Sequence, residues 1–201
     1  KYWTQSINDG LNKTKNLRFC DIGSARGLFV KSFNEQGWDA HGVEPCKTIA
    51  QWSIKEYGLK NITISTIEEV EYPDNYFDLI QFWHVLEHVI DPVLVLDKIY
   101  RWLKPGGVLN LGTPSPDNLI SKIYPTITGN FDIGAGHTYI FPVKTLNELL
   151  CSIGFEVKNH EAYSTNKAGN TIKIKIRNLL HNIYPKAVFY YQRLNAYKPI
   201  N

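Results

Sequence analysis

The sequence is poor in several residue types and patterns, and each shortage excludes a class of protein. Its 201 residues include no methionine and only three cysteines, which are too few and too scattered for a disulfide framework. No apolar run reaches the ~18 residues of a membrane-spanning helix. The first residues, KYWTQSINDG, lack the apolar core of a signal peptide. We therefore expect a cytoplasmic protein, and the missing methionine leads us to expect a piece of a longer chain.

Acidic residues are missing from the end of the chain. From Ala162 to Asn201 there are seven Lys and Arg residues and no Asp or Glu, which leaves 15 basic and all 19 acidic residues in the rest. Residues 171–184 also place apolar side chains on one face of a basic amphipathic helix. We expect this tail, 165–201, to pack on the domain with a solvated basic rim. The alternative is contact with an anionic or lipid-linked substrate or a membrane surface, which would make the protein membrane-peripheral.

Strand patterns and helix patterns alternate along the chain. We expect strands at 17–23, 39–45, 61–66, 77–83, 108–114 and 155–163, and helices at 27–37, 46–58, 92–103 and 145–154. This alternation predicts an α/β fold of the Rossmann-like, doubly wound kind, with a mostly parallel sheet covered on both faces. We expect a single domain over 1–201, with a substrate-binding or lid insertion at 114–142, because a loop that long is usually functional.

In such a sheet, ligands bind at the carboxyl ends of the strands. The first strand ends in the turn FCDIGSARGLF, where Gly23 and Gly27 let a ligand approach the backbone. The second strand ends at Glu44, 17 residues beyond Gly27, close to the ~20 expected for an acid that binds a ribose. A carboxylate accepts hydrogen bonds from both ribose hydroxyls. Together these features indicate an adenosine-type ligand, and the alternative is a capped turn beside a solvated glutamate.

The same turn lacks the glycines of a dinucleotide-binding loop. Ala25 and Leu28 stand where G-x-G-x-x-G requires glycine, and Asp21 stands where phosphates would approach. These residues disfavour a diphosphate and suit a ligand with a cationic end. They count against an NAD-type oxidoreductase or epimerase, which is the alternative enzyme class.

The stretch RFCDIGSARGLF resembles the first motif, D-x-G-x-G-x-G, of class I S-adenosylmethionine-dependent methyltransferases. Four further stretches resemble this family in order and spacing: GVEP, FDLIQFWHVLEHVIDP, LKPGGVLNLGTP and HTYIFPVKTLNELLCSIGFEV. The resemblance covers about residues 17–160 and is to the small-molecule branch, which includes ubiquinone-pathway and sugar O-methyltransferases. It implies a seven-stranded sheet with an antiparallel edge strand, which residues 186–194 would supply.

The resemblance also implies the cofactor, S-adenosylmethionine, and the product, S-adenosylhomocysteine. Arg26 either points to solvent or reaches the cofactor carboxylate. Thr66 stands where the family often has Asp, and it is a weaker acceptor for the adenine amine. The implied roles are: for the methionine part, Asp21, Gly23, Ser24, Ala25 and Gly27; for the ribose, Glu44; for the adenine, Pro45, Thr66 and Ile67; for the floor, Phe82 and Trp83, followed by His84.

The family's chemistry requires mainly alignment, and an acceptor hydroxyl also needs a base, for which histidine is the likeliest side chain type near neutral pH. We predict that His137, at the end of the long insertion, and His88 are catalytic. We expect O-methylation of a small-molecule or conjugate acceptor. The alternative is an RNA-modifying enzyme, but no basic-aromatic RNA module is present, so nucleic acid is not the expected partner.

The string HVLEH, residues 84–88, matches the H-x-x-E-H pattern of inverted zinc peptidases. However, it begins at a strand end and fits the methyltransferase signature around it. We therefore predict no metal site, and we expect Glu87 and His88 to form a structural hydrogen bond at the start of a helix. Metal binding by His84, Glu87 and His88 is the alternative.

Overall fold

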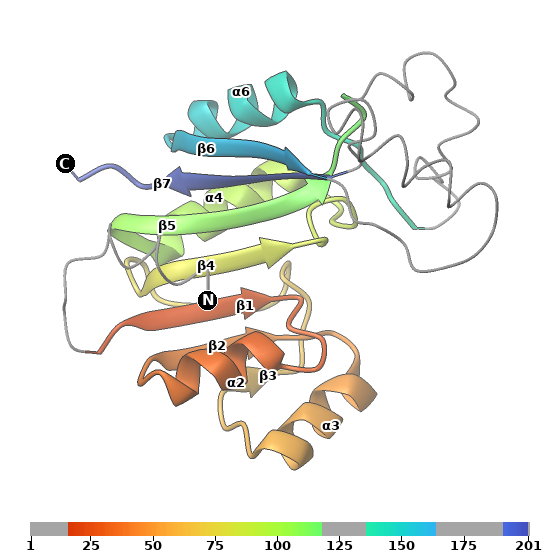
Figure 1. The fold of residues 1–201 in the computed structure, drawn as a ribbon, viewed down its shortest axis with the longest axis vertical. Helices are drawn as coiled ribbons and strands as arrows, with labels where there is room; N and C mark the ends of the chain where they lie inside the picture. Colours follow the sequence, from red (N-terminus) through yellow and green to blue (C-terminus); the bar gives the residue numbers. More distant parts are fainter. Residues whose placement is uncertain (1–15, 118–135, 164–190, 201) are drawn as a thin grey trace.

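The computed structural model describes residues 16–117, 136–163 and 191–200, in which strands and helices alternate as predicted (Figure 1). The strands are β1 (Arg18–Ile22), β2 (Asp39–Val43), β3 (Ile62–Thr63), β4 (Phe77–Trp83), β5 (Leu103–Pro114), β6 (Glu156–Tyr163) and β7 (Tyr191–Tyr197). The helices are α2 (Leu28–Glu35), α3 (Lys47–Tyr57), α4 (Pro92–Trp102) and α6 (Val143–Ile153).

All seven strands form one sheet in the order β3-β2-β1-β4-β5-β7-β6. The first five are mutually parallel, and β7 runs antiparallel to both β5 and β6. The predicted doubly wound, mostly parallel fold is therefore confirmed. The antiparallel strand stands one place inside the edge, which β6 forms, and of the expected strand at 186–194 only 191–194 are described.

The order of the strands creates a crevice at one edge of the sheet. The chain passes from β1 outward to β3 and then returns to β4 on the other side of β1. The connections after β1 and β4 therefore leave in opposite directions, which opens a crevice at the carboxyl ends of these two strands. In Figure 1 the parallel strands point to the right, so their carboxyl ends lie on that side.

Side chains of the central strands alternate between two apolar layers. Phe19 of β1 stacks on Phe33 of α2 with ring centroids 3.9 Å apart, whereas Cys20 and Ile22 pack into the layer under α4 and α6. Helix α2 thus covers one face of the sheet, and α4 and α6 cover the other (Figure 1). The buried side of α2 is formed by Val30 and Phe33.

The first turn of α2 leaves two large apolar side chains uncovered. Leu28 and Phe29 are 59% and 44% exposed, although they fall on the apolar side of the helix in sequence. Both lie at the end of the helix nearest the crevice, where they line a cavity described below. Their exposure therefore belongs to the candidate site rather than to the core.

Helix α4 begins at Pro92, where the sequence predicted a helix to start, and not beside Glu87 and His88. Asp91 caps it, and its carboxylate accepts hydrogen bonds from the backbone nitrogens of Val93 and Leu94, each at 3.0 Å. Pro92, at the first helical position, suits this start because its missing N–H has no helical partner there. Residues 84–88 therefore form a turn between β4 and α4.

The predicted insertion, 114–142, and tail, 165–201, lie partly outside the described residues. At the base of the insertion the Asp117 carboxylate accepts a hydrogen bond from the backbone nitrogen of Val143, so its two ends are joined. The amphipathic segment 171–184 lies outside the described residues. Within the described ranges, no helix combines the length and apolarity needed to cross a membrane.

Candidate functional site

The turn after β1 is fixed against the end of β2. The backbone nitrogens of Gly23 and Ser24 both donate to the carbonyl of Val43, at 2.8 and 3.0 Å. Gly23 has a φ of +75°, and a Cβ there would overlap the side chain of Val85. Glycine is therefore required at this position by both the backbone and the close approach of the loop after β4.

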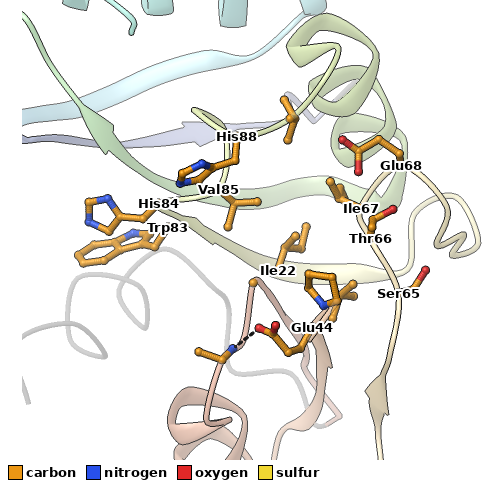
Figure 2. Close-up of a pocket in the computed structure, with 15 residues that line it drawn as sticks. Ile22, Glu44, Ser65, Thr66, Ile67, Glu68, Trp83, His84, Val85 and His88 are labelled. Atoms are coloured by element: carbon orange, nitrogen blue, oxygen red, sulfur yellow. Dashed lines mark hydrogen bonds between the residues drawn. The ribbon is translucent and has the colours of Figure 1, made fainter. Parts of the chain in front are cut away.

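Glu44 follows β2 and is tied to the same turn. Its Oε2 accepts a hydrogen bond from the backbone nitrogen of Ala25 at 2.8 Å, and its Oε1 accepts one from that of Cys46 at 2.8 Å. Figure 2 shows the first of these bonds as a dashed line. Glu44 is only 7% exposed, and each oxygen keeps a lone pair for a further donor. The carboxylate is thus oriented before any ligand arrives.

A cavity of about 550 Å³ opens beside this carboxylate. Figure 2 shows its three walls: Glu44 on one side, Ser65–Glu68 on the second, and Trp83, His84 and His88 on the third. Lys98 of α4 stabilises the second wall. Its Nζ donates hydrogen bonds to the carbonyls of Ile67 and Glu68, at 3.2 and 2.9 Å. The volume of this cavity lies within the range of volumes found for small-molecule and cofactor sites.

A second cavity, of about 430 Å³, continues from the first. The two share Gly23, Ala25 and Trp83 in their walls. Asp21 lies on the wall of the second cavity and is 4% exposed, and it accepts a hydrogen bond of 3.3 Å from Nε2 of Gln81. Burial raises the pKa of Asp21 to about 7; the bond from Gln81 opposes this shift and the charge of Glu44 adds to it.

Two histidines and a buried carboxylate meet beside the larger cavity; His88 lines it, whereas Glu87 and His137 are not among its described lining residues. Nitrogen atoms of His88 and His137 and a carboxylate oxygen of Glu87 lie within 4.8 Å of one another. Glu87 is 1% exposed and accepts a hydrogen bond of 3.0 Å from Oγ1 of Thr113. The carbonyl of Glu87 also accepts a bond from the backbone nitrogen of Thr138 at 2.7 Å. This backbone bond holds the segment carrying His137 against the turn carrying His88.

The hydrogen bonds around this cluster determine which ring nitrogens are available. Nδ1 of His88 lies 2.8 Å from the carbonyl of Gly136, so Nδ1 carries the proton and Nε2 has a free lone pair. Nδ1 of His137 is buried and has no hydrogen-bond partner among the described residues. The cluster can therefore accept a proton from a ligand. The same atoms could instead hold a divalent metal ion, since imidazole and carboxylate are common ligands.

Comparison with known proteins places the chain in a family. Over residues 2–160 the sequence matches the family described as a methyltransferase domain. The chain belongs to this methyltransferase family. The predicted family is therefore confirmed, and the family together with the fold implies S-adenosylmethionine as the cofactor.

Curated relatives of this methyltransferase domain carry different activities in their names. The ubiquinone biosynthesis O-methyltransferase of Nitrobacter winogradskyi is 34% identical over 107 residues, which are 51% of this chain and 41% of that protein. The phosphoethanolamine N-methyltransferase 3 of Arabidopsis thaliana is 28% identical over 109 residues, 49% of this chain and 22% of that protein. The chain thus spans less than half the length of these relatives.

Solved structures share the fold at low sequence identity. An S-adenosylmethionine-dependent methyltransferase from Archaeoglobus fulgidus has a TM-score of 0.68 at 22% identity, with 98% of this chain and 92% of that chain covered. The cyclase SpnF has a TM-score of 0.71 at 19% identity, with 100% of this chain and 81% of that chain covered. Because a protein named as a cyclase has this fold, the fold alone does not determine the reaction.

Most of the residues assigned to the cofactor from the sequence surround the two cavities of the methyltransferase domain. Ser24 lies on the wall of the smaller cavity, buried, and its hydroxyl has no partner among the described residues. His84 lies on the wall of the larger cavity, and its Nδ1 is 3.3 Å from Oε1 of Glu87. The larger cavity is also lined by the predicted Gly23, Ala25, Glu44, Pro45, Thr66, Ile67 and Trp83.

Two of the assigned residues line neither cavity. Phe82 is fully buried in the apolar layer under α4, because side chains alternate along β4 and those of Gln81 and Trp83 take the opposite side. Gly27 precedes α2 with a φ of +70°, and a Cβ there would lie 2.6 Å from Cδ1 of Leu59. Gly27 therefore serves the packing of the turn, and Phe82 serves the core.

The sequence analysis did not name Gln81 as part of the site, and it gave Glu87 a different partner. Gln81 bonds Asp21, and the period-2 alternation with Trp83 could have indicated that it faces the crevice. Glu87 was expected to bond His88 at a helix start, which is wrong: it lies in a turn and its described side-chain partners are His84 and Thr113. The long separation of Thr113 from this turn left no signal in the sequence.

Proposed function

We propose that this domain transfers a methyl group from S-adenosylmethionine to a hydroxyl group of a small molecule or small-molecule conjugate. The observation that carries the proposal is the Glu44 carboxylate, which both Ala25 and Cys46 hold in a cavity that extends to His88. An acid for a ribose and a base for an acceptor thus stand at two walls of one cavity.

The residues present fit the cofactor at both of its ends. The lone pairs left on Glu44 suit the two hydroxyls of a ribose, and Pro45 and Ile67 offer apolar surface for an adenine. The glycine at position 23 lets the ligand pass from one cavity to the other without meeting a Cβ. Asp21 supplies a carboxylate in the second cavity, where a cationic amino-acid end would be stabilised.

When bound, S-adenosylmethionine supplies a methyl group on a positively charged sulfur, and S-adenosylhomocysteine is the product. Nε2 of His88, which lines the larger cavity, would accept the proton of an acceptor hydroxyl. Glu87, buried beside it, stabilises the imidazolium that results, and His137 positions the acceptor or shares the proton. Alignment of the reactants can contribute roughly 7–11 kcal/mol, and a general base roughly 10²–10⁴-fold in rate.

The histidine cluster favours oxygen over nitrogen as the methylated atom. A hydroxyl must lose its proton when it is methylated, and His88 and His137 provide a place for that proton. A neutral amine already has a free lone pair and needs no such base for its attack, whereas an ammonium group must first lose a proton. The relatives include both an O-methyltransferase and an N-methyltransferase. The proposal of oxygen as the methylated atom therefore rests on the histidine base. Contact of the basic tail with an anionic or lipid-linked acceptor stays a prediction.

Transfer of a radioactive methyl group tests this proposal. The protein is incubated with methyl-tritiated S-adenosylmethionine and, separately, with a dihydroxybenzoate, phosphoethanolamine or bulk transfer RNA. We expect label in the hydroxylated aromatic compound and none above background in the amine or the RNA. Label in phosphoethanolamine or RNA alone would contradict hydroxyl methylation.

A further inference from the structure

The smaller cavity carries two opposite charges at different depths. Of its described lining residues, two are charged: Asp21, buried in the wall, and Arg26, exposed at the rim. Leu28, Phe29 and Ile49 make the rest of the rim apolar. One acid and one base at different depths complement a zwitterion rather than a simple cation or anion.

The guanidinium of Arg26 is held in place without using its hydrogen-bond donors. Its Cζ lies 5.5 Å from the centre of the Trp52 ring of α3, within the range of a cation–π contact. Among the described residues, no hydrogen bond or ion pair engages this guanidinium. A guanidinium presents N–H donors in a planar fork that matches a carboxylate. The Trp52 contact therefore leaves the fork available for such a partner.

The position of Arg26 decides which part of a ligand it can meet. The larger cavity holds the ribose acid, Glu44, and the smaller cavity is reached from it past Gly23, Ala25 and Trp83. A nucleoside seated on Glu44 therefore directs its 5′ substituent into the smaller cavity. In S-adenosylmethionine that substituent ends in an ammonium and a carboxylate. Asp21 suits the ammonium, and Arg26 is the described cation that remains for the carboxylate.

We propose that Arg26, held by Trp52, binds the carboxylate of the cofactor's amino-acid end and makes the protein selective for ligands that carry it. This inference rests on the proposed function, because it takes the cofactor to be S-adenosylmethionine. Arg26 also lines a neighbouring hollow of about 260 Å³ with Thr48, Ile49 and Trp52. This hollow leaves room beside the Arg26 side chain for a bound carboxylate.

The test compares two ligands that differ only in the carboxylate. Calorimetric titration with S-adenosylmethionine and with decarboxylated S-adenosylmethionine is carried out on the wild type, R26A and R26K. The matched control is K31A, since Lys31 is another half-exposed cation over an aromatic ring, Tyr57, and it does not line the cavity. Arg26 is exposed, so R26A should fold, and a thermal melt of each variant checks this.

We expect R26A to bind S-adenosylmethionine roughly tenfold more weakly and decarboxylated S-adenosylmethionine as the wild type does. The affinity of R26K for S-adenosylmethionine should lie between those of the wild type and R26A, because lysine keeps the positive charge but lacks the planar fork of donors. K31A should match the wild type for both ligands. An equal loss for both ligands, or no loss for either, would overturn the role of Arg26. Failure of the wild type to bind S-adenosylmethionine would instead remove the proposed function, and the role of Arg26 with it.

Discussion

The backbone nitrogen of Ala25 lies 2.8 Å from Oε2 of Glu44, and this hydrogen bond joins the turn after β1 to the end of β2. Ala25 has a positive φ, +46°, so the turn holds a non-glycine residue in the left-handed region. The segment that would wrap the amino-acid part of the cofactor and the acid that would bind its ribose are therefore one preorganised unit. Preorganisation lowers the entropy cost of binding.

Replacing Gly23 by alanine should be more harmful than the same change at Gly37. Both glycines have a positive φ, +75° and +83°, so alanine costs roughly 1–2 kcal/mol at either position. At Gly37 a Cβ would meet no atom within 4 Å, whereas at Gly23 it would overlap Val85. We expect roughly 1–3 kcal/mol of additional destabilisation at Gly23, measured by urea denaturation. Equal losses for the two variants would contradict the close contact with Val85.

Asp21 should make stability depend on pH. Its pKa rises from 3.8 to about 7 on folding, so the folded protein holds an extra proton between these values. The stability that this protonated carboxyl contributes is fully present below about pH 4 and is lost as the pH rises through 7. We expect the wild type to lose roughly 2–3 kcal/mol more than D21N between pH 5 and pH 8 in denaturant titrations. Equal losses of unfolding free energy in the wild type and D21N would contradict a raised pKa of Asp21.

Removing His88 should affect the transfer step rather than cofactor binding. We expect H88Q to transfer the methyl group to a hydroxyl acceptor roughly 10²–10⁴-fold more slowly, with its affinity for S-adenosylmethionine within about twofold of the wild type. The matched control is I90A, two residues further along the chain, where the side chain is 80% exposed. Single-turnover rates and calorimetry separate the two effects. A transfer rate in H88Q equal to that of I90A would remove His88 from the reaction.

A chelator distinguishes the two uses of the Glu87, His88 and His137 cluster. If these residues act on a proton, methyl transfer should be unchanged after dialysis against EDTA. Loss of activity with EDTA, followed by its return with zinc or manganese ions, would show that the cluster holds a metal. The measurement is the rate of label transfer before dialysis, after it, and after each ion is added back.

The parts of the fold that follow local rules could be predicted from the sequence. The alternation of apolar runs predicted β1, β2, β4 and β5 and the helices between them, because buried parallel strands and amphipathic helices have distinct periods. The place of Glu44 at the carboxyl end of β2 follows from the same pattern. The position of β7 between β5 and β6 could not be predicted, because strand order depends on pairing between segments distant in sequence.

The parts of the site that depend on long-range contacts were predicted less well. Phe82 was assigned to the cofactor together with its neighbour Trp83, although adjacent strand residues face opposite sides and Phe82 points into the core. His88 and His137 were both predicted, whereas Glu87 was grouped with His84 and His88 and not with His137. Their meeting depends on backbone bonds from Thr138 and Tyr139 to the carbonyl of Glu87, across about 50 residues of chain.

Cofactor binding by Glu44 tests the central proposal most directly. Calorimetric titration of the wild type, E44A and the control E35A with S-adenosylmethionine and with NAD is the measurement; Glu35 is an exposed acid of α2. We expect the wild type and E35A to bind S-adenosylmethionine and not NAD, and E44A to bind S-adenosylmethionine at least tenfold more weakly. The central proposal would be contradicted if the wild type bound NAD but not S-adenosylmethionine, or if E44A bound S-adenosylmethionine with unchanged affinity.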